Sequence, residues 1–418
     1  MFALRLLLRR FVRQGRLGVI DHTGRRYDFG APGAQPGVTV RLHDPALYRR
    51  LALYPNLHVG TAYTEGTLTV EDGTLADLLN LLLLNEQLAS KGRAGDLKRR
   101  VDELSRLGAV INLPSRARRN VHYHYDHNAD FYRLFLDEDM QYSCGYFASE
   151  QASLEEAQEA KKRHIAAKLD IQPGQRVLDI GCGFGGMALF LARNYGVHVT
   201  GVTLSTEQYK VATERAAKQG LTRLVDFRLQ DYRHIRETFD RIVSVGMFEH
   251  VGRPHYGQFF TRLNALLTDR GVALLHTIGR NQPPQPINVW IRQNIFPGAY
   301  LPSLSQLVPV LEKLDLWLTD FESLRLHYAA TLREWNRRFQ ANRERVRALD
   351  PQRHDERFCR MWEFYLQSCE AGFRHSGLTV FQLQIAKHVS TLPITRDYMP
   401  AEEQRLATAA AATRAAGE

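Results

Sequence analysis

Cysteine is scarce in this sequence, and its spacing excludes the sites that cysteine usually builds. Four cysteines occur among 418 residues, and no two of them form a C-x-x-C pair. Disulfide frameworks and zinc sites depend on such pairs or on similarly regular spacings. We therefore expect reduced thiols in a cytoplasmic protein. The cysteines are Cys144, Cys182, Cys359 and Cys369.

Histidine does not supply a metal site either. His122, His124 and His127 lie close together in the sequence. Their spacing of i, i+2 and i+5 fits neither one face of a helix nor one face of a strand. We predict that no metal is bound there.

Long apolar runs are missing as well. A membrane-spanning helix needs about 20 consecutive apolar residues. The longest candidate, residues 78–84, is interrupted by Asn80. We predict that the chain is not integral to a membrane.

The N-terminal residues form a pattern of their own. Leu4, Leu7, Leu8 and Phe11 recur at i, i+3, i+4 and i+7, which predicts a helix with one apolar face. Arginines interrupt this run, whereas an export signal would have an unbroken apolar stretch. Two interpretations stay open: the helix packs on its own domain, or it lies flat on an anionic membrane surface.

Acidic residues are outnumbered by basic ones. The sequence has 45 Asp and Glu against 55 Lys and Arg, which gives a formal net charge of +10. Such a charge favours a polyanionic partner. Nucleic acid and anionic lipid both satisfy this requirement.

The N-terminal region is predicted to form a small α+β domain over residues 1–90. Residues 37–42 and 67–72 alternate between apolar and polar side chains, which indicates strands. Residues 75–84 are almost wholly apolar, which indicates a buried helix. We expect the N-terminal domain to bind lipid or to support a dimer.

Three further regions follow this domain. Residues 91–120 are polar and rich in charge, which is typical of a linking helix and loop. We predict that residues 121–395 form one large domain. Residues 396–418 end in an alanine-rich, low-complexity tail that we expect to be frayed.

Strands and helices alternate within the large domain. This alternation predicts an open, parallel α/β sheet, in which ligands bind beyond the carboxyl ends of the strands. The predicted strands are 176–180, 198–202, 225–229, 241–245 and 272–275. Mostly polar residues and glycines lie just past the ends of all five, and we expect the polar groups to converge on one cleft. The residues past the strand ends include Gly181, Gly183, Thr203, Leu204, Ser205, Asp231, Glu249 and His276.

The first of these turns indicates a nucleotide cofactor. It reads DIGCGFGG over residues 179–186, and its glycines allow a ligand to approach the backbone closely. The string also fits the G-x-G-x-x-G pattern of dinucleotide-binding enzymes, which alone is a weak signal. Such enzymes carry an acid at the end of the second strand, where this chain has VTLS before Glu207. Asp179, two residues before the first glycine, has the placement seen in S-adenosylmethionine-dependent methyltransferases. We therefore favour a methyltransferase over a dehydrogenase.

Nucleic-acid methylation is not supported by the fourth strand end. Enzymes that methylate an exocyclic base nitrogen have a Pro-Pro-aromatic motif there, and those that attack pyrimidine C5 use a cysteine beside proline. This chain reads GMFEHVG over residues 246–252. Neither signature is present, so the motif does not indicate base flipping.

Several motifs together resemble the cyclopropane-fatty-acyl-phospholipid synthase family. They occur in the family's order between residues 124 and 384, and the N-terminal region is similar to that of the bacterial phospholipid-acting members. The motifs are QYSCGYF at 141–147, VLDIGCG at 177–183, TLSTEQ at 203–208, GMFEHVG at 246–252, HTIG at 276–279 and HYAATLREW at 327–335. The resemblance implies a Rossmann-like class I methyltransferase domain with an open, mostly parallel seven-stranded sheet.

The resemblance also implies roles for individual residues. One set is expected to hold a bicarbonate ion that takes part in the chemistry, and it consists of Cys144, Glu249, His276, Ile278 and Tyr328. The other set, from the resemblance and the turn motifs together, is expected to bind S-adenosylmethionine. It consists of Tyr142, Ser143, Asp179, Gly181, Gly183, Gly185, Thr203, Leu204, Ser205, Gln208, Asp231 and Tyr232. A homodimer is implied as well.

One segment departs from the family pattern. The family's His-Tyr-Asp-x-Gly-Asn-Asp run reads HYDHNAD over residues 124–130, so that Asn128 and Ala129 replace the Gly-Asn pair. This difference affects the geometry expected for the segment that covers the cofactor.

The implied reaction is methyl transfer to the cis double bond of an acyl chain in a membrane phospholipid. A carbocation would form, and bicarbonate would accept a proton so that a cyclopropane ring closes. Glu249 would accept a hydrogen bond from the ion's own hydroxyl group. Two alternatives stay open: a related enzyme that makes methyl-branched or methyl-unsaturated chains, and a catalytically silent lipid-binding protein.

Each of these residues also has a purely structural interpretation. Glu249 is favourably placed as an acid at a helix N-terminus. His276 fits a hydrogen-bonded core histidine, and Cys144 fits a small buried apolar residue whose backbone matters most. Tyr328 without the family motif is only an aromatic residue in a helix.

Overall fold

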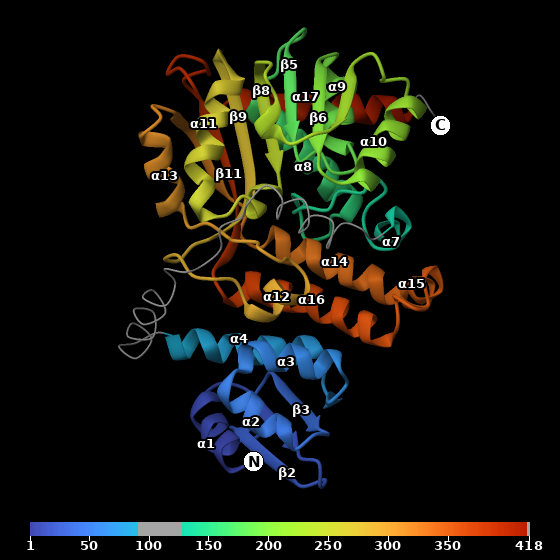
Figure 1. The fold of residues 1–418 in the computed structure, drawn as a ribbon, viewed down its shortest axis with the longest axis vertical. Coiled ribbons are helices and arrows are strands. Elements are labelled where there is room, and N and C mark those ends of the chain that lie inside the picture. The colour runs from blue at the N-terminus through green and yellow to red at the C-terminus, as the bar shows by residue number, and fades with distance from the viewer. Residues whose placement is uncertain (91–127, 416–418) are drawn as a thin grey trace. The chain divides into compact units, whose positions relative to one another are not determined.

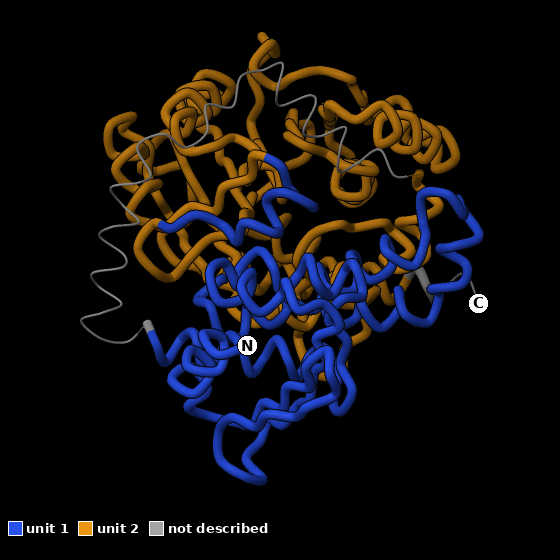
Figure 2. Tube along the Cα trace, turned by 60° about the horizontal axis from the view of Figure 1, so that its bottom comes forward, with its two compact units in different colours: residues 1–110, 285–297, 332–378 blue, residues 111–284, 298–331, 379–418 orange. Residues whose placement is uncertain are grey.

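The computed structural model describes residues 1–90 and 128–415, which fall into two compact units. The first unit comprises residues 1–110, 285–297 and 332–378, and the second comprises 111–284, 298–331 and 379–418 (Figure 2). The predicted linker, 91–120, and the histidine cluster at 122–127 lie outside the described residues.

The first unit is built on a four-stranded sheet with the order β2-β1-β3-β4 (Figure 1). β1 pairs antiparallel with β2 and parallel with β3, and β3 pairs antiparallel with β4. The strands and the helices before residue 91 are α1 Phe2–Phe11, β1 Arg16–Ile20, β2 Arg26–Gly30, β3 Gly37–Leu42, α2 Ala46–Leu53, α3 Pro55–Thr64, β4 Leu68–Asp72 and α4 Leu75–Ser90.

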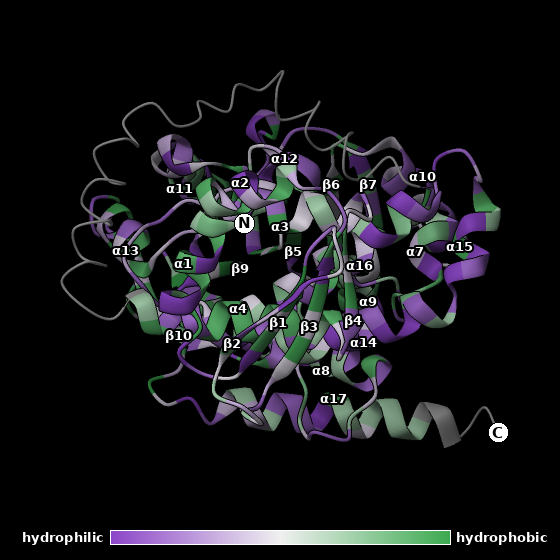
Figure 3. Cartoon of the chain, turned by 90° about the horizontal axis from the view of Figure 1, so that it is seen from below, coloured by the Kyte–Doolittle hydropathy of each residue, from purple (hydrophilic) through white to green (hydrophobic). Residues whose placement is uncertain are grey.

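The first unit also contains three helices from later in the chain, which the expected domain division placed in the large domain. They are α12 Val289–Asn294, α15 Arg343–Leu349 and α16 Glu356–His375. Close packing explains the difference: a Cβ atom added at Gly60 of α3 would meet Phe364 at 2.7 Å and Trp290 at 2.8 Å. Such long-range contacts leave no local pattern in the sequence. The apolar helix α4 is mostly green in Figure 3.

Helix α1 has the predicted position but not entirely the predicted buried face. Leu4 and Leu8 are buried, whereas Leu7 is 37% exposed and Leu6 is 47% exposed. Phe2 is 82% exposed at the start of the helix. Part of the helix therefore packs on its own unit and part presents apolar side chains to solvent. None of the described helices is both long and apolar enough to cross a membrane.

The second unit is built on a seven-stranded sheet with the order β10-β11-β9-β8-β5-β6-β7. β9, β8, β5, β6 and β7 pair in parallel, and β10 pairs antiparallel with β11. All five predicted strands are present, some with longer bounds. The strands are β5 Arg176–Ile180, β6 His198–Thr203, β7 Val225–Leu229, β8 Phe239–Val245, β9 Leu267–Arg280, β10 Trp317–Ser323 and β11 Leu378–Ala386.

Helices cover both faces of this sheet. One apolar core lies between the sheet and α8, α9 and α10, and a second lies between the sheet and α11 and α13. The helices are α7 Ala129–Arg133, α8 Leu154–Leu169, α9 Gly186–Tyr195, α10 Thr206–Lys218, α11 Tyr256–Leu266, α13 Leu304–Glu312 and α17 Tyr398–Ala415. α14 His327–Ala341 is shared between the two units, and short helices occur at η2 Tyr232–His234, η3 Phe248–His250 and η4 Arg253–His255.

The C-terminal tail contradicts the prediction of a frayed end. Residues 398–415 form α17, which packs on α8, and Leu406 is only 1% exposed. Glu402 accepts a hydrogen bond of 2.5 Å from the Tyr195 hydroxyl. Alanine is the strongest helix former, so an alanine-rich sequence becomes an ordered helix once a few side chains anchor it.

Candidate active site

The glycine-rich turn leads from β5 to α9 and forms one wall of a pocket. Gly181 has φ +81°, and a Cβ atom there would meet the Cβ of Met247 at 2.7 Å. Gly183 has φ +55°, and nothing lies within 4 Å of its missing Cβ. The first glycine is thus required by the protein's own packing, and the second leaves space for a ligand to approach the backbone.

Asp179 lies at the base of this wall and is 1% exposed. Its Oδ2 atom has no hydrogen-bond partner among the described residues. Burial raises the pKa of its carboxyl group to about 7. A buried carboxylate oxygen without a donor is unfavourable, so the site fits a ligand that brings a cationic or N–H donor group.

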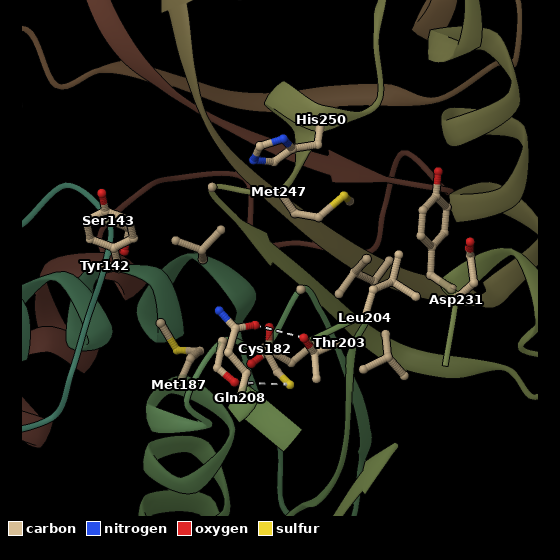
Figure 4. A pocket seen from close by; sticks show the side chains of 18 of the residues that line it. Tyr142, Ser143, Cys182, Met187, Thr203, Leu204, Gln208, Asp231, Met247 and His250 are labelled. Atoms are coloured by element: carbon tan, nitrogen blue, oxygen red, sulfur yellow. Dashed lines mark hydrogen bonds between the residues drawn. The ribbon is translucent and has the colours of Figure 1, made fainter. Parts of the chain in front are cut away.

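The end of β6 carries hydroxyl and amide groups where dinucleotide enzymes have an acid. The Thr203 hydroxyl donates to Gln208 Oε1 at 2.8 Å (Figure 4). Ser205 caps the N-terminus of α10 by accepting from the Gln208 N–H. The nearby acid, Glu207, accepts a hydrogen bond from the Ala129 N–H at 3.2 Å, so it holds the start of α7.

A buried lysine supports the segment that crosses the pocket. The Lys161 ammonium of α8 donates to Ser143 Oγ at 2.8 Å and to Gln141 Oε1 at 2.6 Å. Gln158 donates to the Ser143 carbonyl at 2.9 Å. Burial lowers the pKa of Lys161 to about 8. Sequence reasoning missed Lys161 because lysine is rarely fully buried. The available signal was its place four residues from the apolar Ala157 and Ile165 of α8.

Ten of the twelve residues predicted to bind the cofactor line one pocket (Figure 4). Gly185 and Ser205 do not line it; they lie at the N-caps of α9 and α10. The ten are Tyr142, Ser143, Asp179, Gly181, Gly183, Thr203, Leu204, Gln208, Asp231 and Tyr232. Asp231 is paired with Arg233, and Tyr232 packs edge-on against Phe259.

Some pocket residues were not predicted. Met247 and His250 follow β8 and also line the pocket (Figure 4). Burial lowers the pKa of His250 to about 4, so its imidazole is neutral at physiological pH. Both residues belong to the GMFEHVG motif, which was the signal that could have identified them.

Glu249 belongs to η3 and is a second buried acid of this unit. It is 5% exposed, and its Oε1 accepts the Ile278 N–H at 2.6 Å. Its Oε2 is buried without a hydrogen-bond partner among the described residues. Burial raises the pKa of this carboxyl group to about 7. The free oxygen therefore fits a ligand that donates a hydrogen bond.

His276 lies on β9, two residues before Ile278, and is 2% exposed. Its Nδ1 lies 3.2 Å from Gln382 Nε2 of β11. Burial, reinforced by the positive charges of Lys161 and Lys168, holds the pKa of the imidazole well below its usual range. His276 is therefore a neutral hydrogen-bonding group, not a cation.

A hydrogen bond links the segment that contains Cys144 to the helix that contains Tyr328. The Gly145 N–H, next to Cys144, donates at 3.0 Å to Thr331 Oγ1, one turn after Tyr328 on α14. Burial raises the pKa of the Cys144 thiol, which therefore stays protonated. Of the five predicted anion-site residues, Glu249 and Ile278 are in direct contact, and the segments of Cys144 and Tyr328 are linked through Gly145 and Thr331.

Comparison with known proteins gives a consistent result. Residues 113–383 match the family model described as mycolic acid cyclopropane synthetase. The chain is 34% identical to a "Probable fatty acid methyltransferase" of Pseudomonas putida, over 90% of this chain and 94% of that one. It is 36% identical to the cyclopropane-fatty-acyl-phospholipid synthase of Escherichia coli K12, over 84% and 88% of the two chains.

Solved structures show the same relationship. The mycolic acid cyclopropane synthase CmaA1, complexed with SAH and CTAB, superposes with a TM-score of 0.60 and 35% identity. The superposition covers 65% of this chain and 98% of that one. The pocket described above lies within the part of the chain that matches the family model.

Proposed function

The chain belongs to the mycolic acid cyclopropane synthetase family of methyltransferases, and we propose that it closes cyclopropane rings on acyl chains of membrane phospholipids. Family membership confirms the resemblance seen in the sequence. The predicted fold, an α/β class I methyltransferase domain with a seven-stranded, mostly parallel sheet, is confirmed as well. S-adenosylmethionine would supply the methyl group, and bicarbonate would supply the base.

The observation that carries the proposal is the free carboxylate oxygen of Glu249 near a neutral histidine. Glu249 Oε2 needs a hydrogen-bond donor, and an anion beside it would be repelled unless that anion carried its own O–H. His276, being neutral, is suited to donate one hydrogen bond to the anion's other oxygens. Bicarbonate has both features: a hydroxyl group to donate and oxygens to accept.

The cofactor pocket has the groups that S-adenosylmethionine requires. Asp179 Oδ2 would accept from the ammonium of the methionine end, and Ser143 would lie beside the same end. Thr203 and Gln208 would face the ribose hydroxyls, and Tyr232 would pack near the adenine. The sulfonium methyl would then be held close to a double bond, which is needed because an alkene is a weak nucleophile.

The reaction requires a dry environment. Methyl transfer forms one carbon–carbon bond, breaks the carbon–sulfur bond and leaves a positive charge on the neighbouring chain carbon. Loss of a proton from the added methyl group then supplies the electron pair that closes the ring. Water would trap the cation, and buried aromatic residues beside Glu249 help to exclude it. These residues are Phe248, Tyr256, Phe259 and Phe260.

Helix α1 supports a membrane as the source of the substrate. Phe2, Leu6 and Leu7 are exposed, and Arg9 and Arg10 of the last turn are exposed as well. An exposed apolar and basic helix is suited to lie at the surface of an anionic bilayer. The net charge of +10 favours the same partner. We propose peripheral association with the cytoplasmic face of the membrane.

A membrane-binding experiment tests whether α1 contacts the membrane. The double variant Leu6→Ser/Leu7→Ser should co-sediment with anionic vesicles several-fold less than the wild type, with turnover on detergent-dispersed lipid unchanged. Leu349→Ser, which alters an apolar residue that is 42% exposed on α15, is the matched control. Equal binding by both variants and the wild type would exclude α1 as the membrane contact.

Expression in a host that lacks the activity tests the reaction. Cells fed a monounsaturated fatty acid should gain one CH2 in their phospholipid acyl chains, with upfield ring protons in the NMR spectrum. A gain found only in free fatty acids would contradict the phospholipid substrate. No gain by a protein that still binds S-adenosylmethionine would favour a silent lipid-binding protein.

A second candidate is suggested by the Pseudomonas putida relative. That protein is named a fatty acid methyltransferase, and its similarity extends over nearly the whole chain. A related reaction would leave a methyl-branched or methyl-unsaturated chain because the cation loses a different proton. A methyl doublet or retained vinyl protons in the product would support it. A homodimer also stays a prediction, which light scattering of the purified protein tests.

A further inference from the structure

A row of buried polar side chains lies behind His276, and the proposed reaction does not account for it. Gln382 of β11 is fully buried, and Lys168, near the end of α8, is 2% exposed. Gln382 Nε2 lies 3.2 Å from His276 Nδ1, and Gln382 Oε1 lies 2.9 Å from Lys168 Nζ. Polar groups are costly to bury, so a continuous row of them requires an explanation.

The donors and acceptors of this row can be assigned in order, starting from Lys168. An ammonium group only donates hydrogen bonds, so the side of the Gln382 amide that faces it must be the oxygen. The NH2 side of the amide then faces His276 and donates to Nδ1. Because a neutral imidazole has one acceptor and one donor nitrogen, the hydrogen of His276 resides on Nε2.

Lys168 is itself held in place from several sides. Its ammonium forms an ion pair with Glu322 and lies 3.5 Å from Asp320 Oδ2. The ammonium therefore has little freedom to turn away from Gln382.

The charges around Lys168 continue toward the C-terminal helix. Glu322 also bonds His164 Nε2 at 2.6 Å, and His164 Nδ1 meets Glu403 of α17 at 2.8 Å. Arg396 pairs with Asp320 at 2.8 Å. Burial would lower the pKa of His164, but the two carboxylates raise it. Three carboxylates are thus balanced by three basic groups, which makes a stable anchor for the row.

We propose that Lys168 and Gln382 are positioning residues that fix His276 as the Nε2–H tautomer, so that Nε2 donates to the anion held beside Glu249. The identity of that anion rests on the proposed function. The tautomer itself does not, since it follows from contacts within the protein. An imidazole with its hydrogen on Nδ1 would instead present a lone pair to the anion and repel it.

The direct test is 15N NMR of the histidine ring nitrogens in protein labelled on histidine. The His276 signals are identified by their absence from a His276→Gln variant. Wild type should show a protonated Nε2 and an unprotonated Nδ1. Gln382→Glu should reverse this pattern because a carboxylate accepts a hydrogen from Nδ1. A wild-type ring protonated at Nδ1, or an unchanged pattern in Gln382→Glu, would overturn the inference.

Kinetics provide the second readout. In Gln382→Glu the turnover at saturating S-adenosylmethionine should fall on the order of 10²-fold, the usual cost of losing one donor to a reacting anion. The bicarbonate concentration for half-maximal turnover should rise, while the Kd for S-adenosylmethionine should not change. If bicarbonate supports wild-type turnover and the dependence is the same in Gln382→Glu, the positioning role is contradicted.

Two further variants separate positioning from general stability. Gln384→Leu removes another buried glutamine of β11, which bonds Tyr398 and Lys168 but not His276. It should lower the melting temperature and leave the His276 tautomer as in wild type. Lys168→Arg, which keeps a cation facing the amide oxygen, should retain the tautomer, and Lys168→Met should lose it. If the tautomer is as expected but bicarbonate does not affect turnover, the proposed anion is wrong and the positioning inference stands.

Discussion

The two halves of the seven-stranded sheet build their parts of the site in different ways. The half formed by β5, β6 and β7 uses tight turns: Gly181, Gly183 and the capped start of α10 bring backbone toward the pocket. The half formed by β8, β9 and β11 uses buried side chains, with Glu249 and His276 each under 6% exposed.

This difference matches the two tasks that the proposed reaction requires. A large, flexible cofactor is recognised by many small contacts along an open edge, for which backbone and short side chains suffice. A small anion at the reacting atoms has to be held in a fixed orientation, for which buried and pre-oriented polar groups are needed. We therefore expect substitutions in the first half to affect cofactor affinity and substitutions in the second half to affect turnover.

The largest effect should come from Glu249→Gln. The amide would present an NH2 group or a weaker acceptor to the bicarbonate hydroxyl, so turnover should fall on the order of 10²- to 10³-fold. The Kd for S-adenosylmethionine, measured by calorimetry, should stay within about twofold of wild type if the halves act separately.

Glu312→Gln is the control for this substitution because Glu312 is exposed at the end of α13. It should behave as wild type. Normal ring formation by Glu249→Gln would remove the proposed role of Glu249.

A smaller effect, on cofactor affinity more than on turnover, is expected for Gly181→Ala. The added Cβ would lie 2.7 Å from the Met247 Cβ. Residue 181 would also have to keep a φ of +81°, which costs alanine about 1–2 kcal/mol. The Kd for S-adenosylmethionine should rise at least about tenfold, with turnover at saturating cofactor less affected.

Gly196→Ala is the matched control, since it has φ +64° but open space around its missing Cβ. It should reduce stability by about 1 kcal/mol and leave cofactor binding unchanged. If it weakened cofactor binding as much as Gly181→Ala, the loss would come from strain in general and not from the pocket wall.

The smallest effects should be those of pH on cofactor affinity and on turnover, which report on Asp179 and Glu249 separately. The pKa of Asp179 and that of Glu249 are both raised to about 7 by burial, so both groups are protonated below that pH and ionised above it. Cofactor affinity should therefore improve as the pH rises through about 7, because Asp179 would accept from the ammonium as a carboxylate. Turnover at saturating cofactor and fixed bicarbonate should rise over the same range because of Glu249.

Two variants distinguish these titrations. In Asp179→Asn the rise in cofactor affinity should disappear, and in Glu249→Gln the rise in residual turnover should disappear. A wild-type turnover that falls as the pH rises through 7 would mean that Glu249 acts in its protonated form.

The sequence predicts one half of the sheet better than the other, for physical reasons. Strands β5 and β6 are apolar runs bounded by glycine and polar residues, so the sequence predicts both their positions and the turns that follow them. β11 was not predicted, because Gln382 and Gln384 interrupt its apolar pattern although both are buried. Lys161 and Lys168 were missed since a lysine in a helix is expected to face solvent.

The first unit shows the same limit. Its β3, β4 and α4 follow local patterns and were predicted, whereas β1 and β2 were not. The inclusion of α12 and α16 depends on contacts such as Gly60 with Trp290, which join residues far apart in the sequence. Residue roles in the anion site came from the family resemblance, since burial and partners of Glu249 and His276 are visible only in the structure.

The most direct test of ring closure uses S-adenosylmethionine with a fully deuterated methyl group. The purified protein is incubated with this cofactor, bicarbonate and vesicles of a monounsaturated phospholipid, and the acyl chains are examined by mass spectrometry and proton NMR. We expect the product to retain two of the three deuterium atoms and to have ring protons but no vinyl protons. A product that retains all three deuterium atoms, or one that keeps a double bond, would contradict ring closure by loss of a proton from the transferred methyl group.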